Sequence, residues 1–368
     1  MNYYSLAKIL KTNARYNIIF GERSNGKTYA VLDHSVKEYF KTGAQLAVIR
    51  RWREDFKGKR GAAYFDNLVY NGEGENKIKE YSKGKYDHVV YLSGRWYMAY
   101  YDEELEKNIT APEPFAFSFA LTEMEHEKGN SYPLIQNVLY DEFMTRGMYL
   151  PDEFVLFMNS LSTIIRRRDN VKIFCCANTV DMRGCVLFKE MGITKARNGA
   201  MKKGDLDVYD YGNSGLRVAV EYCDTQLEGK PSDVYFAFDN PKLKMITSGE
   251  WEIDIYPHMK ESINPKEIVF SYFIIYDDNT LQADLIVKDN ATFTFIHPKT
   301  TPIKYEDKDI IFTTDADIRY NYCGRITKPI NKAIRKLYWF YVANKVFYSD
   351  NEVGEIVARY LYWCNNNK

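Results

Sequence analysis

Residues 21–28 match the P-loop, or Walker A, pattern G-x-x-x-x-G-K-[ST] at every specified position. The apolar residues 16–20 before it predict a buried strand, and residues 27–40 predict a helix. The motif needs this strand–loop–helix order, because its backbone N–H groups and the helix N-terminus must face a polyphosphate. The residues expected to contact a nucleotide are Gly21, Glu22, Arg23, Ser24, Asn25, Gly26, Lys27 and Thr28.

Two residues of this loop have defined chemical roles. Lys27 can reach the outer phosphates and the Thr28 hydroxyl can bind Mg²⁺, so ATP and Mg²⁺ are the expected cofactors. Glycine at both ends lets the backbone curl so that successive N–H groups point to one anion. The alternative is a glycine-rich turn with an unrelated lysine, which the flanking strand and helix disfavour.

A second strand-end motif lies further along the chain. Residues 134–140 predict a strand that runs into Asp141 and Glu142, the pattern called Walker B. Asp141 is expected to hold the Mg²⁺ shell and Glu142 to polarise the attacking water, since phosphoryl transfer depends mainly on positioned charge. A glutamate beside the aspartate is typical of ASCE-type P-loop NTPases, which carry their own base. A solvated strand end is the alternative.

The next strand is predicted over 171–177 and ends at Asn178. A polar residue at that position can contact the γ-phosphate or the attacking water. An ordinary strand-end asparagine is the alternative interpretation.

Three arginines, at 166–168, close a helix predicted to begin at Pro151. Arginine near a helix C-terminus interacts favourably with the helix dipole, which is one interpretation. The other is an arginine finger that enters a neighbouring subunit's nucleotide site and stabilises transition-state charge, with Arg166 or Arg168 favoured over Arg167. A second candidate group follows an earlier strand and comprises Arg50, Arg51 and Arg53.

The composition is that of a globular protein with room for two domains. The chain has 368 residues, of which 45% are hydrophobic, and a formal net charge of zero, which argues against a nucleic-acid coat over its whole surface. No apolar run is long enough to span a membrane, and the first residues do not resemble a signal peptide. The six cysteines show no C-x-x-C spacing, which favours a reducing, intracellular setting.

The order of predicted elements indicates two domains. Residues 1–200 alternate strands and helices as in a parallel α/β sheet, with a β-hairpin insertion within 62–110. Residues 201–250 are assigned to a linker region. Residues 251–368 predict an α+β domain with a β-meander over 268–296, followed by helices over 328–346 and 351–364.

A basic, glycine-flanked loop follows the strand at 45–51. Its side chains Lys57, Lys59 and Arg60 are candidates for contact with DNA phosphates, which a protein moving along any sequence must use in place of base edges. A solvated run of charge is the alternative.

Together these features resemble the DNA-packaging ATPases of the phi29-like small tailed phages (podophages), which are related to terminase large subunits. The resemblance is dense over 15–180, thin over 200–260, and weaker in the second domain. Besides the P-loop near the start, it rests on the segments 48–52, 127–133, 140–143, 165–169 and 176–178.

The resemblance implies a homo-oligomeric ring, a homopentamer, on the portal vertex of a procapsid in the host cytoplasm. There it would drive double-stranded DNA inward with ATP, and it would be absent from the mature virion. It further implies a trans-acting finger at Arg166 or Arg168 and a DNA-facing loop that contains Lys128. The phi29 relatives also use a structural RNA, and the sequence leaves that requirement open.

The resemblance also implies an RNase H-like fold for the C-terminal domain. Larger packaging enzymes cut DNA with this fold through clustered carboxylates that bind two metal ions. Here the strand at 268–276 carries no acid in its middle, and Asp277 and Asp278 suit a hairpin turn. Asp315 and Asp317 suit a helix start. The domain is therefore expected to lack nuclease activity.

Three alternatives to a pure DNA translocase stay open. A terminase large subunit would have both ATPase and endonuclease activity. A P-loop kinase would lack a trans arginine and would not respond to DNA, and Glu142 and the long second domain count against it. A nucleotide-binding module without turnover would have no need of Glu142.

Overall fold

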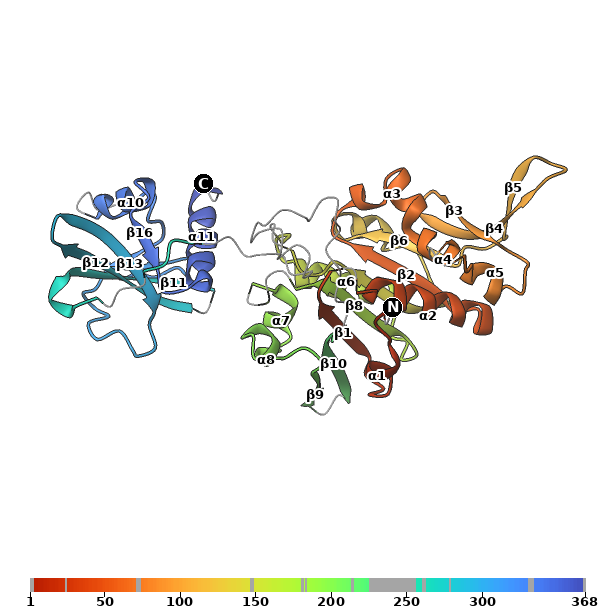
Figure 1. Ribbon diagram of the computed structural model, residues 1–368, viewed down its shortest axis with the longest axis horizontal. Helices are drawn as coiled ribbons and strands as arrows, with labels where there is room; N and C mark the ends of the chain where they lie inside the picture. The colour runs from red at the N-terminus through yellow and green to blue at the C-terminus, as the bar shows by residue number, and fades with distance from the viewer. Residues whose placement is uncertain are drawn as a thin grey trace. The chain divides into compact units, whose positions relative to one another are not determined.

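The computed structural model describes residues 3–23, 25–70, 74–145, 149–179, 182, 184–212, 215–224, 256–259, 263–277, 279–329 and 334–366 (Figure 1). The chain divides into two compact units, Met1–Trp251 and Glu252–Lys368. Within the described residues, no helix is both long and apolar enough to cross a membrane.

The first unit is built on one large sheet. Among the described residues ten strands form it, in the order β3-β4-β6-β2-β7-β8-β1-β10-β9, with β5 paired to β4. The strands are β1 (Tyr16–Gly21), β2 (Gln45–Arg50), β3 (His88–Leu92), β4 (Arg95–Asp102), β5 (Lys107–Thr110), β6 (Ala116–Ala120), β7 (Ile135–Asp141), β8 (Lys172–Asn178), β9 (Leu206–Tyr211) and β10 (Leu216–Tyr222).

The middle of this sheet is parallel, from β6 through β2, β7, β8 and β1 to β10. Strand β8 lies between β1, which leads into the P-loop, and β7, which ends at Asp141. This intervening strand is the arrangement expected of an ASCE-type NTPase, and it confirms the predicted fold class. Because parallel strands share their carboxyl edge, β1, β7 and β8 bring their last residues together.

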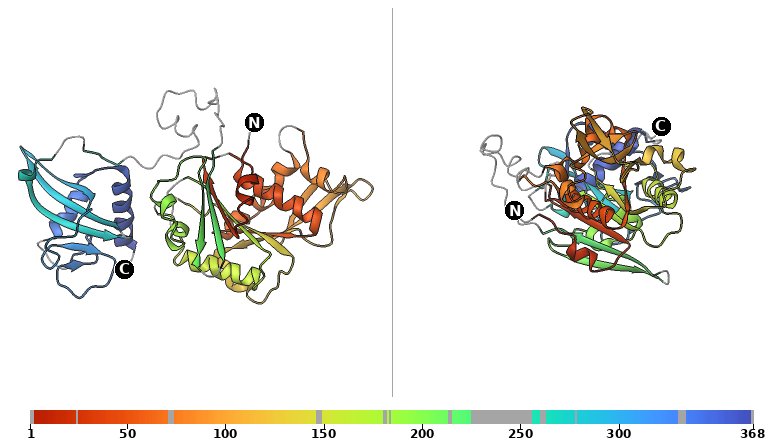
Figure 2. Two further views of the ribbon diagram at one scale, coloured as in Figure 1. Left: turned by 90° about the horizontal axis from the view of Figure 1, so that it is seen from below. Right: turned by 90° about the vertical axis from the view of Figure 1, so that its right-hand side faces the viewer.

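Helices cover both faces of the sheet (Figure 2). Helix α2 (Lys27–Thr42) buries Val31, Leu32 and Val36 in one hydrophobic cluster. Helix α6 (Glu153–Ile165) buries Phe157 and Leu161 in a second cluster, which also contains side chains of α7 (Val186–Glu190). Burial on both faces explains why the parallel strands are near-continuous apolar runs.

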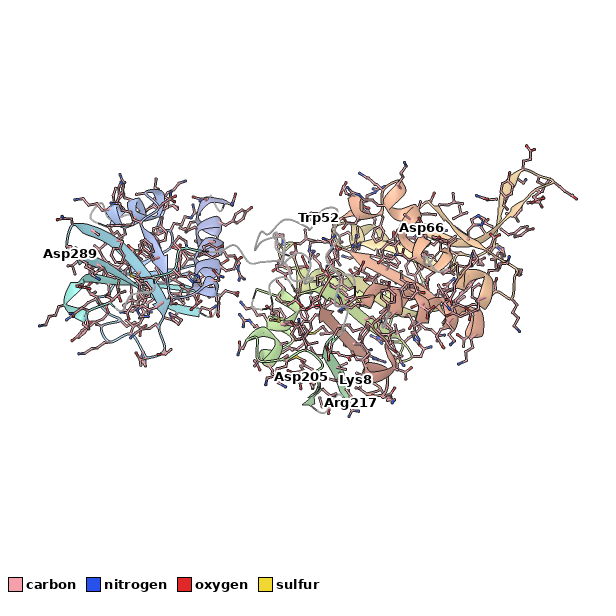
Figure 3. The ribbon with its side chains drawn as sticks, viewed as in Figure 1. Lys8, Trp52, Asp66, Asp205, Arg217 and Asp289 are labelled. Atoms are coloured by element: carbon pink, nitrogen blue, oxygen red, sulfur yellow. The ribbon has the colours of Figure 1, made fainter. Side chains whose placement is uncertain are left out.

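Residues 206–211 and 216–222 belong to this sheet, which differs from their assignment to a linker region. Strands β9 and β10 form an antiparallel hairpin, and β10 pairs in parallel with β1. The buried Val218, Ala219 and Val220 pack into the clusters on the two faces, and the strand satisfies the outer backbone groups of β1. Lys8, Asp205 and Arg217 lie at this edge (Figure 3). The rest of the proposed linker, from residue 225, lies outside the described residues.

The insertion at 62–110 also extends the main sheet. Strands β3 and β4 form the expected hairpin around Ser93 and Gly94, whose φ angles of 47° and 80° suit a two-residue turn. Strand β4 then pairs antiparallel with β6 at Arg95 and Trp96. Short helices precede the hairpin, namely α3 (Lys59–Ala62), α4 (Asp66–Val69) and α5 (Lys77–Tyr81).

Helix α6 is shorter than the 151–168 predicted from the sequence. It begins at Glu153 and ends at Ile165, because Arg166 and Arg167 have φ angles of 45° and 66° in the left-handed region. The backbone N–H of Arg166 still bonds the carbonyl of Ser162 at 3.2 Å and closes the last turn.

The second unit is a smaller α+β structure. Among the described residues its sheet has six strands in the order β15-β14-β11-β12-β13-β16. Strands β11, β12 and β13 form the predicted antiparallel meander, and β14 and β15 run parallel to β11, which is the strand order of an RNase H-like fold. The strands are β11 (Ile268–Tyr276), β12 (Asn279–Lys288), β13 (Ala291–Pro298), β14 (Ile311–Thr313), β15 (Tyr322–Cys323) and β16 (Val346–Tyr348).

The helices of this unit follow the meander. Helix α10 (Arg335–Val342) is shorter than the helix predicted over 328–346, since Asn344 has a φ of 54° and residues 346–348 pair with β13 as β16. Helix α11 (Asn351–Asn366) agrees with its prediction and buries Val353, Ile356 and Tyr360 against the sheet.

Asp284 of β12 is buried and organises a polar cluster. Its carboxylate accepts hydrogen bonds from Ser271 Oγ at 2.6 Å, Gln282 Nε2 at 2.9 Å and His297 Nε2 at 3.2 Å. Burial would raise the pKa of Asp284, but these hydrogen bonds outweigh it and lower the pKa. The hydrogen bond to Asp284 raises the pKa of His297 above its usual 6.5, against the opposing effect of burial.

This cluster predicts that the stability of the second unit depends on pH. Because the pKa of His297 is raised on folding, its contribution to stability is complete below pH 6.5 and is lost as the pH rises through the folded-state pKa. We expect amide exchange in β12 and β13 of the full chain to show extra acceleration over that range, and His297→Gln to remove it. The exposed His126 supplies the control variant, His126→Gln. The same pH dependence in wild type and His297→Gln would contradict the assignment.

Candidate active site

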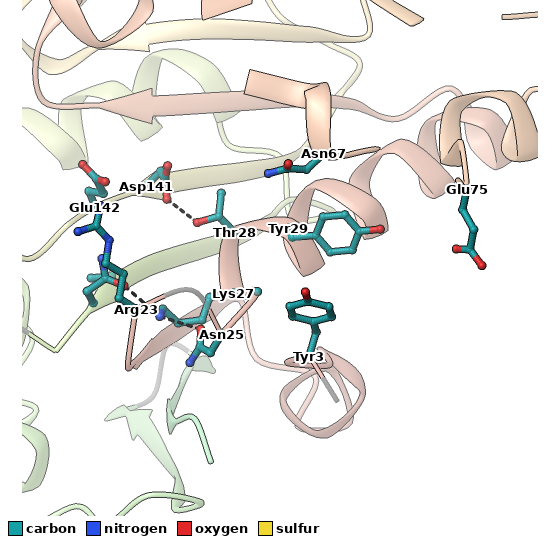
Figure 4. Close-up of a pocket in the computed structure, with 13 residues that line it drawn as sticks. Tyr3, Arg23, Asn25, Lys27, Thr28, Tyr29, Asn67, Glu75, Asp141 and Glu142 are labelled. Atoms are coloured by element: carbon teal, nitrogen blue, oxygen red, sulfur yellow. Dashed lines mark hydrogen bonds between the residues drawn. The ribbon is translucent and has the colours of Figure 1, made fainter. Parts of the chain in front are cut away.

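A cavity of about 630 Å³ opens at the carboxyl ends of the central parallel strands (Figure 4). Gly21, Asp141 and Asn178, the last residues of β1, β7 and β8, meet at this edge of the sheet. Ligands of open parallel sheets bind at this edge. The cavity is lined by Tyr3, Arg23, Asn25, Gly26, Lys27, Thr28, Tyr29, Asn67, Glu75, Asp141, Glu142, Ala177 and Asn178.

The P-loop places Lys27 at the start of helix α2. Gly26 caps the helix with a φ of 86°, and a side chain there would also meet the Tyr3 ring at 3.2 Å, so only glycine suits the position. Asn25 is buried and accepts a hydrogen bond from Lys27 at 2.9 Å. Ser24, also expected in the loop, lies outside the described residues.

Lys27 is a buried cation, and the oxygens to which Nζ donates are all uncharged. The residue is 5% exposed, and Nζ donates to the carbonyl of Glu22 at 2.6 Å and to Asn178 Oδ1 at 3.3 Å. Within the described residues, no carboxylate lies at ion-pairing distance from Nζ, and burial lowers the pKa of Lys27. Burying an uncompensated charge is unfavourable, so the site is suited to an anion such as a phosphate group.

Thr28 and Asp141 form the candidate Mg²⁺ site. Thr28 Oγ1 lies 2.8 Å from Asp141 Oδ1, which joins the helix after β1 to the end of β7. Hydroxyl and carboxylate oxygens are the ligands Mg²⁺ prefers, and Mg²⁺ also binds phosphate oxygens and water, so the residues fit the cation. The other oxygen of Asp141 accepts a hydrogen bond from Tyr64 at 2.8 Å and pairs with Arg50 at 3.2 Å. Burial and the nearby Asp141 raise the pKa of Tyr64 well above 10, so its hydroxyl stays a donor.

Glu142 stands at the mouth of the cavity. Its side chain is 60% exposed, and its backbone has a φ of 59°, which turns the chain away from the strand. The backbone N–H bonds the carbonyl of Cys176 at 2.7 Å, and Arg50 holds the carboxylate at 2.9 Å. The carboxylate therefore lies next to the candidate Mg²⁺ ligand Asp141, and a carboxylate at this place has the chemistry to accept a proton from water. Bound Mg²⁺ would neutralise charge on the phosphates.

A buried ion pair supports the turn that carries Glu142. Arg51 makes a bidentate pair with Glu153, at 2.7 and 2.8 Å, and also donates to the carbonyls of Glu142 and Phe143. Glu153 is 1% exposed and accepts a further hydrogen bond from Tyr140 at 2.6 Å. Arg51 and Tyr140 both donate to the Glu153 carboxylate, and Arg51 also holds two carbonyls of the turn, so the turn after β7 is fixed by long-range contacts.

Two tyrosines that line the cavity, Tyr3 and Tyr29, were not predicted from the sequence. Tyr3 and Tyr29 lie on the side of Thr28 away from Glu142, where a nucleobase would extend from the phosphates (Figure 4). The N-terminal segment is held there because the Tyr4 N–H bonds the carbonyl of Asn25 at 2.9 Å and the Tyr4 hydroxyl bonds Glu221 at 2.7 Å. Tyr29 directly follows the motif and could have been suspected; Tyr3 could not.

Residues 1–191 of the chain match the family described as "Podovirus DNA encapsidation protein (Gp16)". The chain belongs to this family. It is 25% identical over 183 residues to the DNA packaging protein of Bacillus phage phi29, and 25% identical over 169 residues to that of Bacillus phage B103. These matches span 49% and 45% of this chain and 47% and 44% of the relatives, so the chain matches about half their length.

Two solved structures share the fold over nearly the whole chain. "The bacteriophage Phi-29 viral genome packaging motor assembly" is similar with a TM-score of 0.62 and 18% identity, over 98% of each chain. "The Phi-28 gp11 DNA packaging Motor" is similar with a TM-score of 0.53 and 14% identity, over 100% of this chain and 98% of that one. At these identities the likeness shows the fold.

Arg166 and Arg168 lie at the opposite edge of the sheet from the cavity. They precede β8, whose seven residues extend roughly 20 Å to Asn178, so neither can reach the cavity of its own chain. Arg168 donates to the carbonyls of Ile164, Ile165, Tyr132, Pro133 and Ile135. These hydrogen bonds connect the end of α6 to the start of β7 and the residues before it. Arg166 is exposed and donates to the carbonyls of Lys128 and Asn130.

The second group of candidate finger arginines, Arg50, Arg51 and Arg53, makes its contacts within its own chain. Arg50 and Arg51 are engaged within their own chain, beside Asp141, Glu142 and Glu153. Arg53 is exposed and pairs with Glu123 at 2.9 Å. Two of the three are therefore part of the site's own framework.

The candidate DNA-contacting residues are all exposed. Lys57 pairs with Glu54 at 2.8 Å, Arg60 donates to the carbonyl of Glu54, and Lys59 begins helix α3, so the basic segment is partly helical. Lys128 pairs with Glu125 at 2.5 Å and lies beside Arg166. Lys57, Lys59 and Arg60 follow the carboxyl end of β2, on the same edge as the cavity.

Two carboxylates of the second unit, Asp315 and Asp317, do not take the places predicted for them. Asp315 and Asp317 begin no helix; Asp317 pairs with Arg319, whose hydrogen bond lowers the pKa of Asp317 to about 2. Asp277 lies in the turn after β11, as predicted, while Asp278 is not among the described residues. Within the described residues, no group of three or more His, Cys, Asp or Glu side chains could hold a metal ion.

The buried pair predicts a large difference between two neighbouring arginines. Arg51→Leu would leave Glu153 buried without its partner, and we expect a loss of about 3–5 kcal/mol in the free energy of unfolding. Arg53→Leu removes only an exposed ion pair and should cost less than about 1 kcal/mol. Urea denaturation of the two variants measures the difference, and equal losses would show that Arg51 does not support the site.

Proposed function

We propose that this protein is an ATPase that drives double-stranded viral DNA into a procapsid as a homo-oligomeric ring motor at the portal vertex. The observation that carries the proposal is the Thr28–Asp141 contact of 2.8 Å, with Glu142 as the next residue, in a member of the DNA encapsidation family. This arrangement supplies a phosphate cradle, a Mg²⁺ site and a base, the parts that ATP hydrolysis requires.

Each site residue takes a defined role in this reaction. Lys27 neutralises the outer phosphates, and Thr28 and Asp141 orient Mg²⁺. Glu142 accepts a proton from the attacking water. Asn178 lies close enough to Lys27 to contact the γ-phosphate or that water. Arg50 pairs with the Glu142 carboxylate and orients it.

We propose Arg166 as the finger that completes the neighbouring subunit's site. Its place at the far edge of the sheet supports a trans role, because it cannot approach its own nucleotide. Its exposure supports this assignment over Arg168, whose guanidinium is engaged by five backbone carbonyls of its own chain. The finger would form only in an assembled ring, which we take to be a pentamer.

The partners follow from the family and the exposed basic residues. Lys57, Lys59, Arg60 and Lys128 are proposed to contact DNA phosphates. The portal of the procapsid is the proposed docking partner, and a requirement for a structural RNA stays open. The motor would act in the host cytoplasm and leave before the virion matures.

A terminase that also cuts DNA is the second candidate. Asp277 follows β11 and Asp315 follows β14, and the register that pairs Ile275 with Thr313 brings these two acids to the same edge. Two carboxylates are fewer than a two-metal nuclease uses, so we favour an inactive domain.

The first test is steady-state ATP hydrolysis with and without linear double-stranded DNA, with the DNA products run on a gel from the same Mg²⁺ or Mn²⁺ reactions. We expect DNA to stimulate hydrolysis and to stay intact. Cleavage would establish the terminase alternative. Hydrolysis indifferent to DNA, even with procapsids added, would contradict the motor.

Glu142→Gln should retain ATP binding and lose turnover, because glutamine keeps the shape but cannot accept the proton. Binding of a fluorescent ATP analogue and hydrolysis by the same preparation measure the two properties. Glu123→Gln, at a half-buried glutamate that does not line the cavity, is the control. Normal hydrolysis by Glu142→Gln would show that another group is the base.

Arg166→Ala should impair only assembled rings. Mixed with Lys27→Ala subunits on procapsids, it should regain hydrolysis at sites that combine an intact P-loop with a neighbour's intact Arg166. Arg168→Ala should instead destabilise the fold, which thermal unfolding detects. Absence of recovery at every mixing ratio would exclude the trans assignment.

A further inference from the structure

Tyr64 contacts the candidate metal site from outside the nucleotide motifs. It lies in a 3-10 turn (Ala63–Phe65) directly after helix α3. Its hydroxyl donates a hydrogen bond of 2.8 Å to Asp141 Oδ2. Neither the P-loop nor the Walker B pattern includes this residue, and Tyr64 does not line the cavity.

The two oxygens of Asp141 have separate partners. Oδ1 accepts from Thr28 at 2.8 Å, and Oδ2 faces Tyr64 at 2.8 Å and Arg50 at 3.2 Å. Two donors on different sides of a carboxylate fix the rotation of its plane. A fixed carboxylate loses less freedom when it binds a cation, so Tyr64 prepares Asp141 for Mg²⁺.

The ring of Tyr64 is itself held by aromatic neighbours. Its centroid lies 5.5 Å from Trp96 and 5.7 Å from Phe65. Trp96 is fully buried and donates from Nε1 to the carbonyl of Gly61, in α3, at 2.7 Å. A side chain at Gly61 would come within 2.4 Å of the Tyr91 ring, so α3 packs tightly on this cluster. A shift of α3 would therefore move Tyr64 as well.

Helix α3 begins with exposed basic residues. Lys59 and Arg60 are in the helix, and Lys57 precedes it. Arg60 is only four positions before Tyr64, about one helical turn. A polyanion bound to these side chains would thus act on the segment whose far end contacts Asp141.

We propose that Tyr64 is a positioning residue for the Mg²⁺ ligand Asp141, through which DNA bound at Lys57, Lys59 and Arg60 strengthens Mg²⁺ binding. This inference rests on the proposed function, because it takes Asp141 as the metal ligand and the basic segment as a DNA contact. It adds a physical route from DNA to the nucleotide within one subunit.

The first experiment measures binding of a fluorescent ATP analogue to the full-length protein as Mg²⁺ is titrated, without hydrolysis as a readout. Tyr64→Phe removes the hydroxyl and keeps the ring, so the half-saturating Mg²⁺ concentration should rise by about 10-fold, as expected for a lost hydrogen bond to a charged group. Binding without Mg²⁺ should stay unchanged, since Lys27 and the P-loop are intact.

Tyr91→Phe is the matched control. Tyr91 packs on the same Trp96 ring, with centroids 4.8 Å apart, but its hydroxyl bonds Ser118 Oγ at 2.9 Å and is not bonded to Asp141. Its Mg²⁺ titration should match that of the wild type. An unchanged titration for Tyr64→Phe, or an equal shift for Tyr91→Phe, would overturn the positioning role.

The second experiment repeats the titration with a saturating DNA duplex. In the wild type, DNA should lower the half-saturating Mg²⁺ concentration, and in Tyr64→Phe it should have no effect. Lys59→Ala combined with Arg60→Ala should also abolish the DNA effect. An equal DNA effect in Tyr64→Phe and wild type would overturn the coupling.

Failure of this inference is distinguishable from failure of the proposed function. If wild type binds the analogue with Mg²⁺ and Lys27→Ala does not, the nucleotide site stands whatever Tyr64→Phe does. If the wild type itself shows no Mg²⁺-dependent binding, the proposed function and this inference both fail.

Discussion

The contact between Thr28 and Asp141 is the constraint on which the rest of the structure depends. It joins the start of α2 to the end of β7, although β8 lies between β7 and the strand that leads into α2. The contact forms only if the strands are parallel, correctly ordered and ended at the same edge. The strand order, the glycine at the start of α2 and the burial of both sheet faces are therefore all needed to bring Thr28 Oγ1 next to Asp141 Oδ1.

The buried charges of the first unit are of two kinds: some have an opposite charge beside them, and one does not. Arg51 and Glu153 are buried but fully compensated, and they hold the turn at Glu142 in place. Lys27 is buried and donates to the uncharged oxygens of Glu22, Asn25 and Asn178, which leaves its charge uncompensated until an anion arrives. The Arg51–Glu153 pair therefore fixes the turn at Glu142. The uncompensated charge of Lys27 leaves a site that a negatively charged ATP phosphate would neutralise.

Local sequence patterns predicted which helices and strands exist better than they predicted where each one ends or which sheet it joins. The parallel strands were recognisable because burial on both faces requires continuous apolar runs, and the Ser93-Gly94 turn because its backbone needs positive φ. The end of α6, the strand at 346–348 and the placement of β9 and β10 were not predicted. The two strand placements depend on partners distant in sequence, β1 for β10 and β13 for β16, and α6 ends where Arg166 and Arg167 take left-handed φ angles.

The sequence by itself determined the P-loop, the Walker B pair and the β8 strand end, because each role belongs to a short, contiguous segment. The tertiary structure alone decided how the arginines are used, since Arg50, Arg51 and Arg168 differ only in what surrounds them. It also decided that Tyr3 lines the cavity and that Tyr64 contacts Asp141. Those contacts join segments far apart in the chain, and no spacing rule records them.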